Sequence, residues 1–318
     1  MTWRLTRRRL LKTTLAAVPG ALAVLSSPRP SFGAVPFKLG IITDEITQEF
    51  EQALDFISHY SLQYCELRDL WKKNIMNLSK DELQRAKDLI EKHQLRVSDI
   101  GSPIMKYNLP EMPAREEKRD TFRANFTEQD TERLLDQSFE LAKFFGIRKV
   151  RIFAYWRVKD PEKAYPHVRD RLAKAAEIAG RADMLLVLEN EHECNIGTGQ
   201  ELGRVLKEIN SPHLKGNWDP GNAVMLGEVP YPGGYEHVRG LFAHVHVKDV
   251  RKDPATGKLQ WAPVGGGFVD WKGQFRALRK DGYEGTMSLE THYRRPDGNK
   301  VESTRESLEG LLKVAAEA

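Results

Sequence analysis

The chain has 318 residues, of which 40% are hydrophobic and only two are cysteines, so it can bury a large core without disulfide bonds and is not a small disulfide scaffold. Its 49 Lys+Arg and 45 Asp+Glu residues give a formal charge of +4, and apolar segments recur along its length, which excludes a disordered polyampholyte. A multi-pass membrane protein is excluded because no second long apolar run follows the N-terminal one.

The first 34 residues are predicted to be a cleaved signal peptide. They hold six basic residues and no acid, an apolar stretch over 13–25, and small residues around 31–34. The run of arginines at 7–9 resembles a twin-arginine export signal, so we expect a periplasmic or secreted protein. The apolar stretch is shorter than the roughly 20 residues that span a bilayer, although an uncleaved tether stays open. Cleavage after Gly33 and after Ala34 both stay open.

Without that segment the chain carries 43 basic and 45 acidic residues, and strand-like runs alternate with amphipathic helical patterns. A capping-box pattern at Ser79 and Glu82 marks the start of one helix, and Gly146 follows the end of another. The expected strands are 37–42, 62–67, 95–101, 148–154, 184–189, 214–219, 241–247 and 285–290. The expected helices are about 47–60, 79–93, 128–145, 162–180, 199–209, 271–279 and 303–316.

Eight strand–helix units without a dividing linker predict a single (β/α)8 TIM barrel over residues 35–318. A dinucleotide-binding open sheet is disfavoured because Thr43-Asp44-Glu45 follows the first strand in place of a glycine-rich turn. Cys65 and Cys194 fall on or beside strands that lie roughly opposite each other in such a barrel. We therefore expect two buried or half-buried thiols rather than a disulfide.

Acidic and imidazole side chains stand at the ends of four successive strands. Glu189 ends the fifth strand, Asp219 ends the sixth, His244 and His246 lie in the seventh, and Glu290 ends the eighth. Active sites of TIM barrels lie at this end of the strands, so the side chains are expected to converge. Carboxylates brought together in this way repel each other unless a metal neutralises them, and the oxygen-rich set suits Mn²⁺, Mg²⁺ or Co²⁺, with Zn²⁺ still open.

These motifs resemble the xylose isomerase-like barrels, which include sugar isomerases and epimerases, inosose and dehydroshikimate dehydratases, and the endonuclease IV type of abasic-site nuclease. The resemblance implies one divalent ion, Mn²⁺ as the first expectation, held by Glu189, Asp219, His246 and Glu290. His246 is implied because the family ligand stands three residues before Asp249. The matching motifs are Leu188-Glu189-Asn190, Asp219-Pro220-Gly221-Asn222, His244-Val245-His246-Val247-Lys248-Asp249, Gly265-Gly266-Gly267-Phe268-Val269-Asp270 and Leu289-Glu290.

In the ketose 3-epimerases of this group, two ligand glutamates face opposite sides of the reacting carbon. One removes a proton to give an enediolate, and the other returns a proton. The resemblance implies these catalytic roles for Glu189 and Glu290. Three positions depart from the epimerase pattern, since Asn195, Asn222 and Lys252 replace a glutamate, a histidine and an arginine. The metal ligands therefore match the epimerases better than the substrate contacts do.

Seven further side chains near the strand ends are expected to contact the substrate. A lysine can reach a substrate oxygen, a histidine next to a ligand glutamate can act as an acid or base, and a tryptophan can stack on a sugar face. Each also has an ordinary alternative, as an ion-paired or surface lysine, a loop histidine or a core tryptophan. His244 is expected to lie behind the ligands. The seven are Glu66, Trp71, Lys106, His192, Asn222, Lys248 and His292.

We therefore expect a metal-dependent sugar isomerase or epimerase that removes a proton next to a metal-bound carbonyl of a carbohydrate or polyol. A lyase or dehydratase that acts on an oxidised (keto) sugar or glycoside by the same first step stays open, as does a non-catalytic sugar-binding barrel. A repair nuclease is disfavoured, because strands two and three end near Glu66 and Gly101 without the extra metal-binding histidines. We expect a small-molecule partner, no nucleic acid and no stable membrane insertion after cleavage, and leave a homo-oligomer open.

Overall fold

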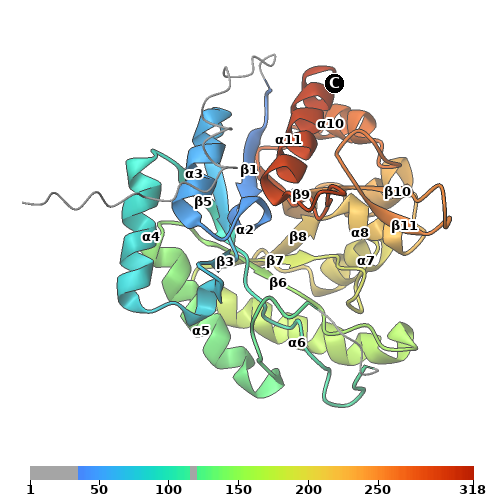
Figure 1. Ribbon diagram of the computed structural model, residues 1–318. Helices are drawn as coiled ribbons and strands as arrows, with labels where there is room; N and C mark the ends of the chain where they lie inside the picture. The colour runs from blue at the N-terminus through green and yellow to red at the C-terminus, as the bar shows by residue number, and fades with distance from the viewer. Residues whose placement is uncertain (1–34, 115–119) are drawn as a thin grey trace, which may run out of the picture.

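The computed structural model describes residues 35–114 and 120–318, which form a closed barrel of eight parallel strands surrounded by helices (Figure 1). Around the barrel the strands follow the order β1-β2-β5-β6-β7-β8-β9-β12, and β12 pairs with β1 to close it. The predicted single (β/α)8 barrel is thus confirmed. The predicted signal peptide over 1–34 lies outside the described residues and stays a prediction.

Each of the eight barrel strands lies within the range expected from the sequence. Val245 and Val247 of the seventh strand face the helices, whereas His244 and His246, two residues apart, share the inner face. Burying one such valine stabilises the fold by roughly 1.5–3 kcal/mol. The strands are β1 (Lys38–Ile42), β2 (Tyr64–Leu67), β5 (Arg96–Ile100), β6 (Lys149–Ile152), β7 (Leu185–Glu189), β8 (Leu214–Trp218), β9 (Phe242–Val247) and β12 (Thr286–Leu289).

The outer helices also follow the expected pattern. The helix α4 begins with the predicted capping box, in which the Ser79 hydroxyl accepts the Glu82 N–H and the Glu82 carboxylate accepts the Ser79 N–H. The long helices are α3 (Phe50–His59), α4 (Lys80–Lys92), α5 (Thr131–Phe144), α6 (Pro161–Arg181), α7 (Gly199–Ile209), α10 (Trp271–Lys280) and α11 (Lys300–Ala316).

The prediction of a helix over 47–60 is wrong at its start. A separate short helix, α2 (Thr43–Ile46), follows β1 directly, and α3 begins only at Phe50. The reason is electrostatic, because Arg68 binds Asp44 and Glu45 of α2, each at 2.8 Å, and all three side chains are buried. The first βα turn therefore belongs to the mouth of the barrel.

Several short insertions were not expected from the sequence. They lie mainly in loops after the strands, where short polar segments carry little periodicity. The inserted elements are the β3 (Asp69–Leu70)–β4 (Lys73–Asn74) hairpin, η1 (Ile75–Asn77), α8 (Pro220–Met225), η3 (Pro230–Gly234), α9 (Tyr235–Val238) and the β10 (Asp249–Lys252)–β11 (Leu259–Ala262) hairpin. The helix expected over 128–145 begins with a short 3₁₀ turn, η2 (Glu128–Asp130), and continues as α5.

Both cysteines are buried free thiols, as expected. Cys65 lies in β2. Cys194 lies beyond the end of β7, where its backbone pairs with that of Trp156 in an isolated antiparallel β-bridge. Within 35–114 and 120–318, no helix combines the length and the apolar character needed to cross a membrane.

Candidate metal centre

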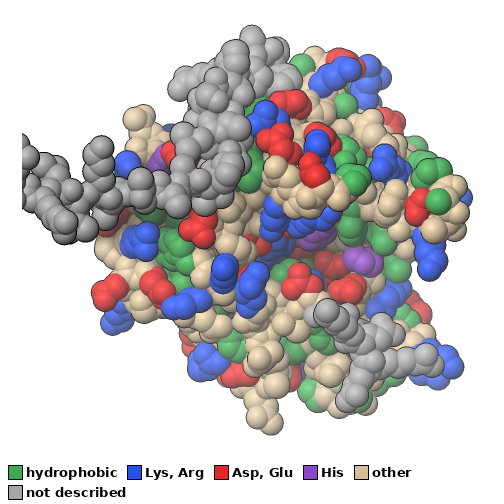
Figure 2. Space-filling view, in the orientation of Figure 1, with side chains coloured by type: hydrophobic (Ala, Val, Ile, Leu, Met, Phe, Trp, Pro, Cys, Tyr) green, Lys and Arg blue, Asp and Glu red, His purple; other side chains and the backbone are tan. Residues whose placement is uncertain are grey.

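The four predicted metal ligands meet at the C-terminal mouth of the barrel. One donor atom from each of Glu189, Asp219, His246 and Glu290 lies within 4.8 Å of the others. The Nδ1 atom of His246 is 3.3 Å from Glu189 Oε1, 3.9 Å from Asp219 Oδ2 and 3.2 Å from Glu290 Oε2. Figure 2 shows a hollow at the centre of this face, where acidic, basic and histidine side chains gather. His246, rather than His244, faces the three carboxylates.

Asp219 is oriented by the turn that follows β8. It is the N-cap of α8, so its Oδ1 accepts the Asn222 N–H at 2.9 Å, and Pro220 occupies the first turn. The Asn190 side chain holds the Asp219 backbone by two hydrogen bonds. Its oxygen accepts the Asp219 N–H at 2.8 Å, and its NH₂ group donates to the Asp219 carbonyl at 2.7 Å. These contacts leave Asp219 Oδ2 directed at the cluster.

Lys248 lies among the carboxylates. Its Nζ is 2.9 Å from Asp219 Oδ2 and 2.5 Å from Glu290 Oε2. Burial alone would lower the pKa of Lys248, but Asp219 and Glu290 raise it well above the ordinary value. Gly221 makes room for this side chain, since a Cβ there would collide with the Lys248 stem. The glycine of the Asp219-Pro220-Gly221-Asn222 motif therefore admits an ammonium group to the site.

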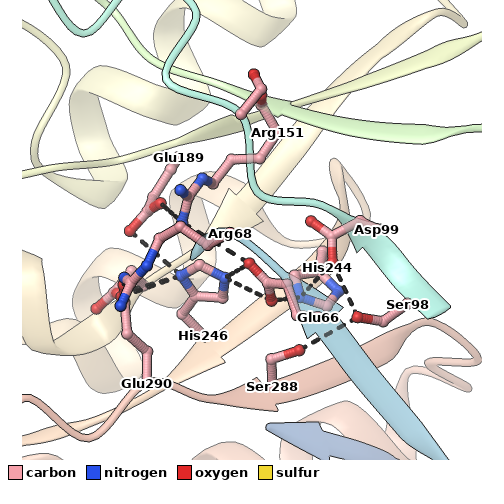
Figure 3. A network of polar contacts seen from close by, with 12 residues as sticks. Glu66, Arg68, Ser98, Asp99, Arg151, Glu189, His244, His246, Ser288 and Glu290 are labelled. Atoms are coloured by element: carbon pink, nitrogen blue, oxygen red, sulfur yellow. Dashed lines mark hydrogen bonds and ion pairs between the residues drawn. The ribbon is translucent and has the colours of Figure 1, made fainter. Parts of the chain in front are cut away.

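Two arginines that the sequence analysis did not single out complete the ring of charge (Figure 3). Arg68 donates to Glu290 Oε1 at 2.6 Å, and Arg151 NH1 lies 3.3 Å from Glu189 Oε2. Arg151 is fully buried on β6. The sequence did contain a signal for Arg151, because it stands two residues after Lys149 in an otherwise apolar strand and so shares its inner face. Arg68 stands two residues after Glu66 in the same way.

The donor set fits a hard divalent cation. The described chain buries ten carboxylates but only four Lys or Arg side chains. Three buried atoms of the cluster, Glu189 Oε2, Asp219 Oδ2 and His246 Nδ1, lack a well-formed hydrogen bond among the described residues, and the two oxygens have only the ion pairs with Arg151 and Lys248. Burial raises the pKa of Asp219 to about 6, against the lowering effect of Lys248, and Glu189 and Glu290 raise it further. A divalent ion would stabilise these oxygen and nitrogen atoms, which are otherwise costly to bury.

The predicted contacts Asn222, His192 and His292 lie next to the ligands. Asn222 donates to Glu189 Oε1 at 3.3 Å, and its carbonyl oxygen lies 2.9 Å from His192 Nδ1. His292 Nε2 lies 3.6 Å from Glu290 Oε1. The side chains of His192 and His292 are about a quarter exposed, so they form part of the rim. Burial alone would lower the pKa of His192, but Glu191 at 2.7 Å raises it above the ordinary value.

Trp261 of β11, which the sequence analysis did not single out, forms an aromatic wall beside the rim histidines. Its ring centroid lies 5.8 Å from that of His192 and 5.3 Å from that of His292, and Lys248 Nζ is 5.2 Å from it. Trp71 instead contacts Phe50 of α3 at 5.5 Å, with Arg85 of α4 over its ring. The sugar-stacking role expected for Trp71 is therefore unsupported, because the β3–β4 turn packs its ring against α3 and α4.

The side chains of Lys106 and Glu66 are buried and contact other protein groups. Lys106 Nζ lies 3.5 Å from Glu191 Oε2 and 3.9 Å from the centroid of the Phe122 ring. Glu66 is fully buried and lies within 3.2 Å of His244 and His246. Lys106 is thus a buried ion-paired lysine, and Glu66 lies behind a candidate ligand.

The departures from the epimerase pattern have separate structural explanations. Asn195 donates to the backbone carbonyls of residues 154–156 and accepts the Val158 N–H at 3.0 Å, so its side chain is fully occupied by the backbone. Lys252 is exposed on the β10–β11 hairpin. Of these three residues, only Asn222 contacts the cluster.

Asp249 explains the glycine-rich motif after β11. Its carboxylate accepts the N–H groups of Gly265, Gly267 and Val269 at 2.9 to 3.1 Å. A Cβ at Gly267 would collide with this carboxylate, so only glycine allows the close approach. Asp249, three residues after His246, therefore holds the return segment of the hairpin, residues 265–269, close to the end of β9.

The model of the xylose isomerase-like TIM barrel family matches residues 54–314 of the chain. An inosose dehydratase from Geobacillus thermodenitrificans is 27% identical over 142 residues, which are 41% of this chain and 47% of that protein. An L-ribulose-5-phosphate 3-epimerase from Shigella boydii is 25% identical over 163 residues, which are 49% of this chain and 54% of that protein. The chain thus spans about half the length of these curated relatives.

Solved structures share the fold over most of the chain. A xylose isomerase-like TIM barrel protein from Mycobacterium smegmatis in complex with magnesium has a TM-score of 0.63 at 19% identity, covering 89% of this chain and 97% of that one. The IOLI protein with a bound zinc atom has a TM-score of 0.67 at 16% identity, covering 88% of this chain and 99% of that one.

Proposed function

The chain belongs to the xylose isomerase-like TIM barrel family, and from this premise we propose that it is a metal-dependent sugar isomerase or epimerase. Its reaction would begin with removal of a proton from a carbon next to a carbonyl of a carbohydrate or polyol. The observation that carries the proposal is the convergence of Glu189, Asp219, His246 and Glu290 on one buried point at the barrel mouth.

We propose that two carboxylates of the cluster work on opposite sides of a substrate carbon. Glu189 ends β7 and Glu290 follows β12, and β8 and β9 separate these strands in the barrel. The two side chains thus come from strands that are not neighbours and meet at His246 Nδ1, at 3.3 and 3.2 Å. In the proposed reaction one of them takes the proton, and the other delivers a proton to the carbon from the opposite face.

A divalent ion held by these four residues would stabilise the negative charge that develops on the substrate oxygens. Mn²⁺ is our first candidate because three carboxylates and one imidazole suit a hard cation, and Mg²⁺, Co²⁺ and Zn²⁺ are the alternatives. Around this point Lys248 would donate to a substrate oxygen, and Trp261 would present an apolar face to a sugar ring. The partly exposed His192 and His292 would bind hydroxyl groups at the rim.

A lyase or dehydratase is the second candidate. It is favoured by the match to an inosose dehydratase and by His192 and His292, since an imidazole at the rim could protonate a departing hydroxyl group. The first step, proton removal beside a carbonyl, is the same. The two candidates differ only in whether the substrate carbon then receives a proton or loses a neighbouring substituent.

Solvent deuterium separates these candidates. The metal-loaded protein would be incubated in D₂O with a panel of ketoses, keto-inositols and keto-glycosides, and products would be examined by NMR and mass spectrometry. An isomerase or epimerase incorporates deuterium at the reacting carbon, whereas a lyase releases an unsaturated product. Turnover of a panel member without exchange, without a primary isotope effect at that carbon and without an unsaturated product would refute the proposal.

From the sequence alone we also propose export of the mature protein. The support is the arginine run at 7–9 followed by the apolar stretch over 13–25. Export would place the enzyme where it meets carbohydrates outside the cytoplasm.

A further inference from the structure

We propose that Glu66 is a positioning residue that fixes which nitrogen of His246 faces the metal. The proposal rests on the proposed function, because it concerns the same metal site. Glu66 lies on β2, below the candidate ligands, and is fully buried. Its carboxylate oxygens lie 3.1 and 3.2 Å from His246 Nε2, and one of them lies 3.2 Å from His244 Nε2 (Figure 3).

The direction of these hydrogen bonds follows from the chemistry of a carboxylate. A carboxylate accepts hydrogen bonds and has none to donate, so both Nε2 atoms must carry the hydrogen. In the neutral form that binds a metal, an imidazole has one N–H, which leaves His246 Nδ1 with a lone pair. That atom faces Glu189, Asp219 and Glu290, at 3.3, 3.9 and 3.2 Å.

The other end of the network independently places the hydrogen of His244 on the nitrogen that faces Glu66. The Lys149 ammonium can only donate, and it lies 2.6 Å from Thr286 Oγ1. The Thr286 hydroxyl therefore has its hydrogen free for His244 Nδ1, which lies 2.7 Å away. His244 Nδ1 then accepts, so the hydrogen of its neutral ring is on Nε2, next to Glu66. A chain of donors thus runs from Lys149 through Thr286 and His244 to Glu66.

This arrangement matters because the alternative would work against a metal. With the hydrogen on Nδ1, His246 would donate to the neighbouring carboxylates and occupy the place of the ion. Glu66 disfavours this state, because its carboxylate would then face an imidazole lone pair. The pair has the form in which metal-binding histidines are usually oriented by a carboxylate. Glu66 would therefore act through His246 and would not touch the substrate, in contrast to the substrate-binding role that the sequence suggested.

The test is the Glu66→Gln variant with Zn²⁺ as the probe. Both Glu66 oxygens lie within 3.2 Å of His246 Nε2, so in glutamine the NH₂ group faces that nitrogen as a donor whichever way the amide is turned, and it favours a lone pair on Nε2. We expect Zn²⁺ affinity, measured by competition with a chromogenic chelator, to fall by about 10- to 100-fold. Glu201→Gln is the matched control, because it removes a half-buried carboxylate that binds Arg157 and the N–H groups before α7 and contacts none of the four candidate ligands. It should leave Zn²⁺ affinity unchanged.

A second measurement needs no variant, which covers the case that Glu66→Gln does not fold. In the zinc-loaded wild-type protein with ¹⁵N-labelled histidine, the NMR spectrum should show one zinc-bound histidine that coordinates through Nδ1 and carries its hydrogen on Nε2. Coordination through Nε2, or a folded Glu66→Gln variant with wild-type Zn²⁺ affinity, would overturn the role of Glu66 and leave the metal site standing. A wild-type protein that binds no divalent metal would overturn the proposed function itself.

Discussion

Glu189 and Glu290 are held by different neighbours, although both belong to one cluster. Glu290 receives short charge-assisted hydrogen bonds from Arg68 at 2.6 Å and Lys248 at 2.5 Å. Burial alone would raise the pKa of Glu290, but Lys248, His292 and His246 hold it well below the ordinary value. The Glu189 oxygens have longer contacts, 3.3 Å to Asn222 and 3.3 Å to Arg151. Both carboxylates are required if one removes a proton and the other returns one.

We therefore predict that Glu189→Gln and Glu290→Gln each lower the rate of carbon–hydrogen exchange on the order of 10²- to 10⁴-fold where the metal is retained. Metal content must be measured on the same samples, because both residues are also candidate ligands. Glu140→Gln, an exposed change on α5, is the control and should leave the rate unchanged. A Glu→Gln variant with full metal content and the wild-type rate would remove that residue from the reaction.

The two thiols give a second prediction at the residue scale. Burial raises the pKa of Cys65 to about 12 and also raises the pKa of Cys194, so neither side chain forms a thiolate near pH 8. A thiol-specific reagent should therefore not react with the folded protein at pH 8. After unfolding without reductant it should react with two thiols per chain. Fewer than two after unfolding would reveal a disulfide, and rapid reaction in the folded state would contradict the burial.

At this scale the sequence predicted the residues that end strands, and it missed those that act from within strands or loops. Glu189 and Glu290 were found because the last strand residue of a TIM barrel faces the site. Arg151 in β6 and Arg68 just after β2 were missed because an inward cation in the sequence does not show which carboxylate it binds. Trp261 was missed because nothing in its sequence neighbourhood places it at the mouth.

The β10–β11 hairpin is an inserted element that contributes side chains to the mouth of the barrel. It follows β9 directly and carries Trp261 to a position beside His192 and His292. Its return segment is fixed by the hydrogen bonds that Asp249 accepts from the glycine-rich loop. The hairpin was not expected, whereas the eight strands and long helices were, because only longer elements show a clear apolar period.

We predict that Trp261→Ala raises KM for the substrate found in the deuterium screen by about tenfold, which corresponds to ~1.4 kcal/mol. The reason is the loss of an aromatic wall next to Lys248. Metal content should be unchanged, because Trp261 is outside the ligand set. Trp71→Ala is the matched control and should leave KM unaltered, since this ring packs on α3 and α4. Equal effects of the two substitutions would argue against a substrate role for Trp261.

For the whole molecule, the alternation of strands and helices was sufficient to predict the closed barrel, because eight such units have few other ways to cover both faces of a parallel sheet. The polar interior could not be predicted. Glu66, Asp99, Lys149 and His244 come from strands far apart in the sequence and are brought together only by barrel closure.

Export from the cytoplasm is also a prediction about the whole molecule. Arg7→Lys together with Arg8→Lys should leave the protein in the cytoplasm, because lysine lacks the planar guanidinium group of the recognised pair. Fractionation of cells that express the wild-type and double-variant proteins would show the difference. Unimpaired periplasmic accumulation of the double variant would contradict the twin-arginine route.

The central claim, one divalent ion at the meeting point of four strand ends, is tested most directly by the metal content of Asp219→Ala. Asp160→Ala is its control, because Asp160 also caps a helix through its side chain but lies at the start of α6. Elemental analysis after equilibration with Mn²⁺ should find about one ion per chain in the wild-type protein and in Asp160→Ala, and almost none in Asp219→Ala. Stoichiometric metal and unchanged activity in Asp219→Ala would contradict the proposed site.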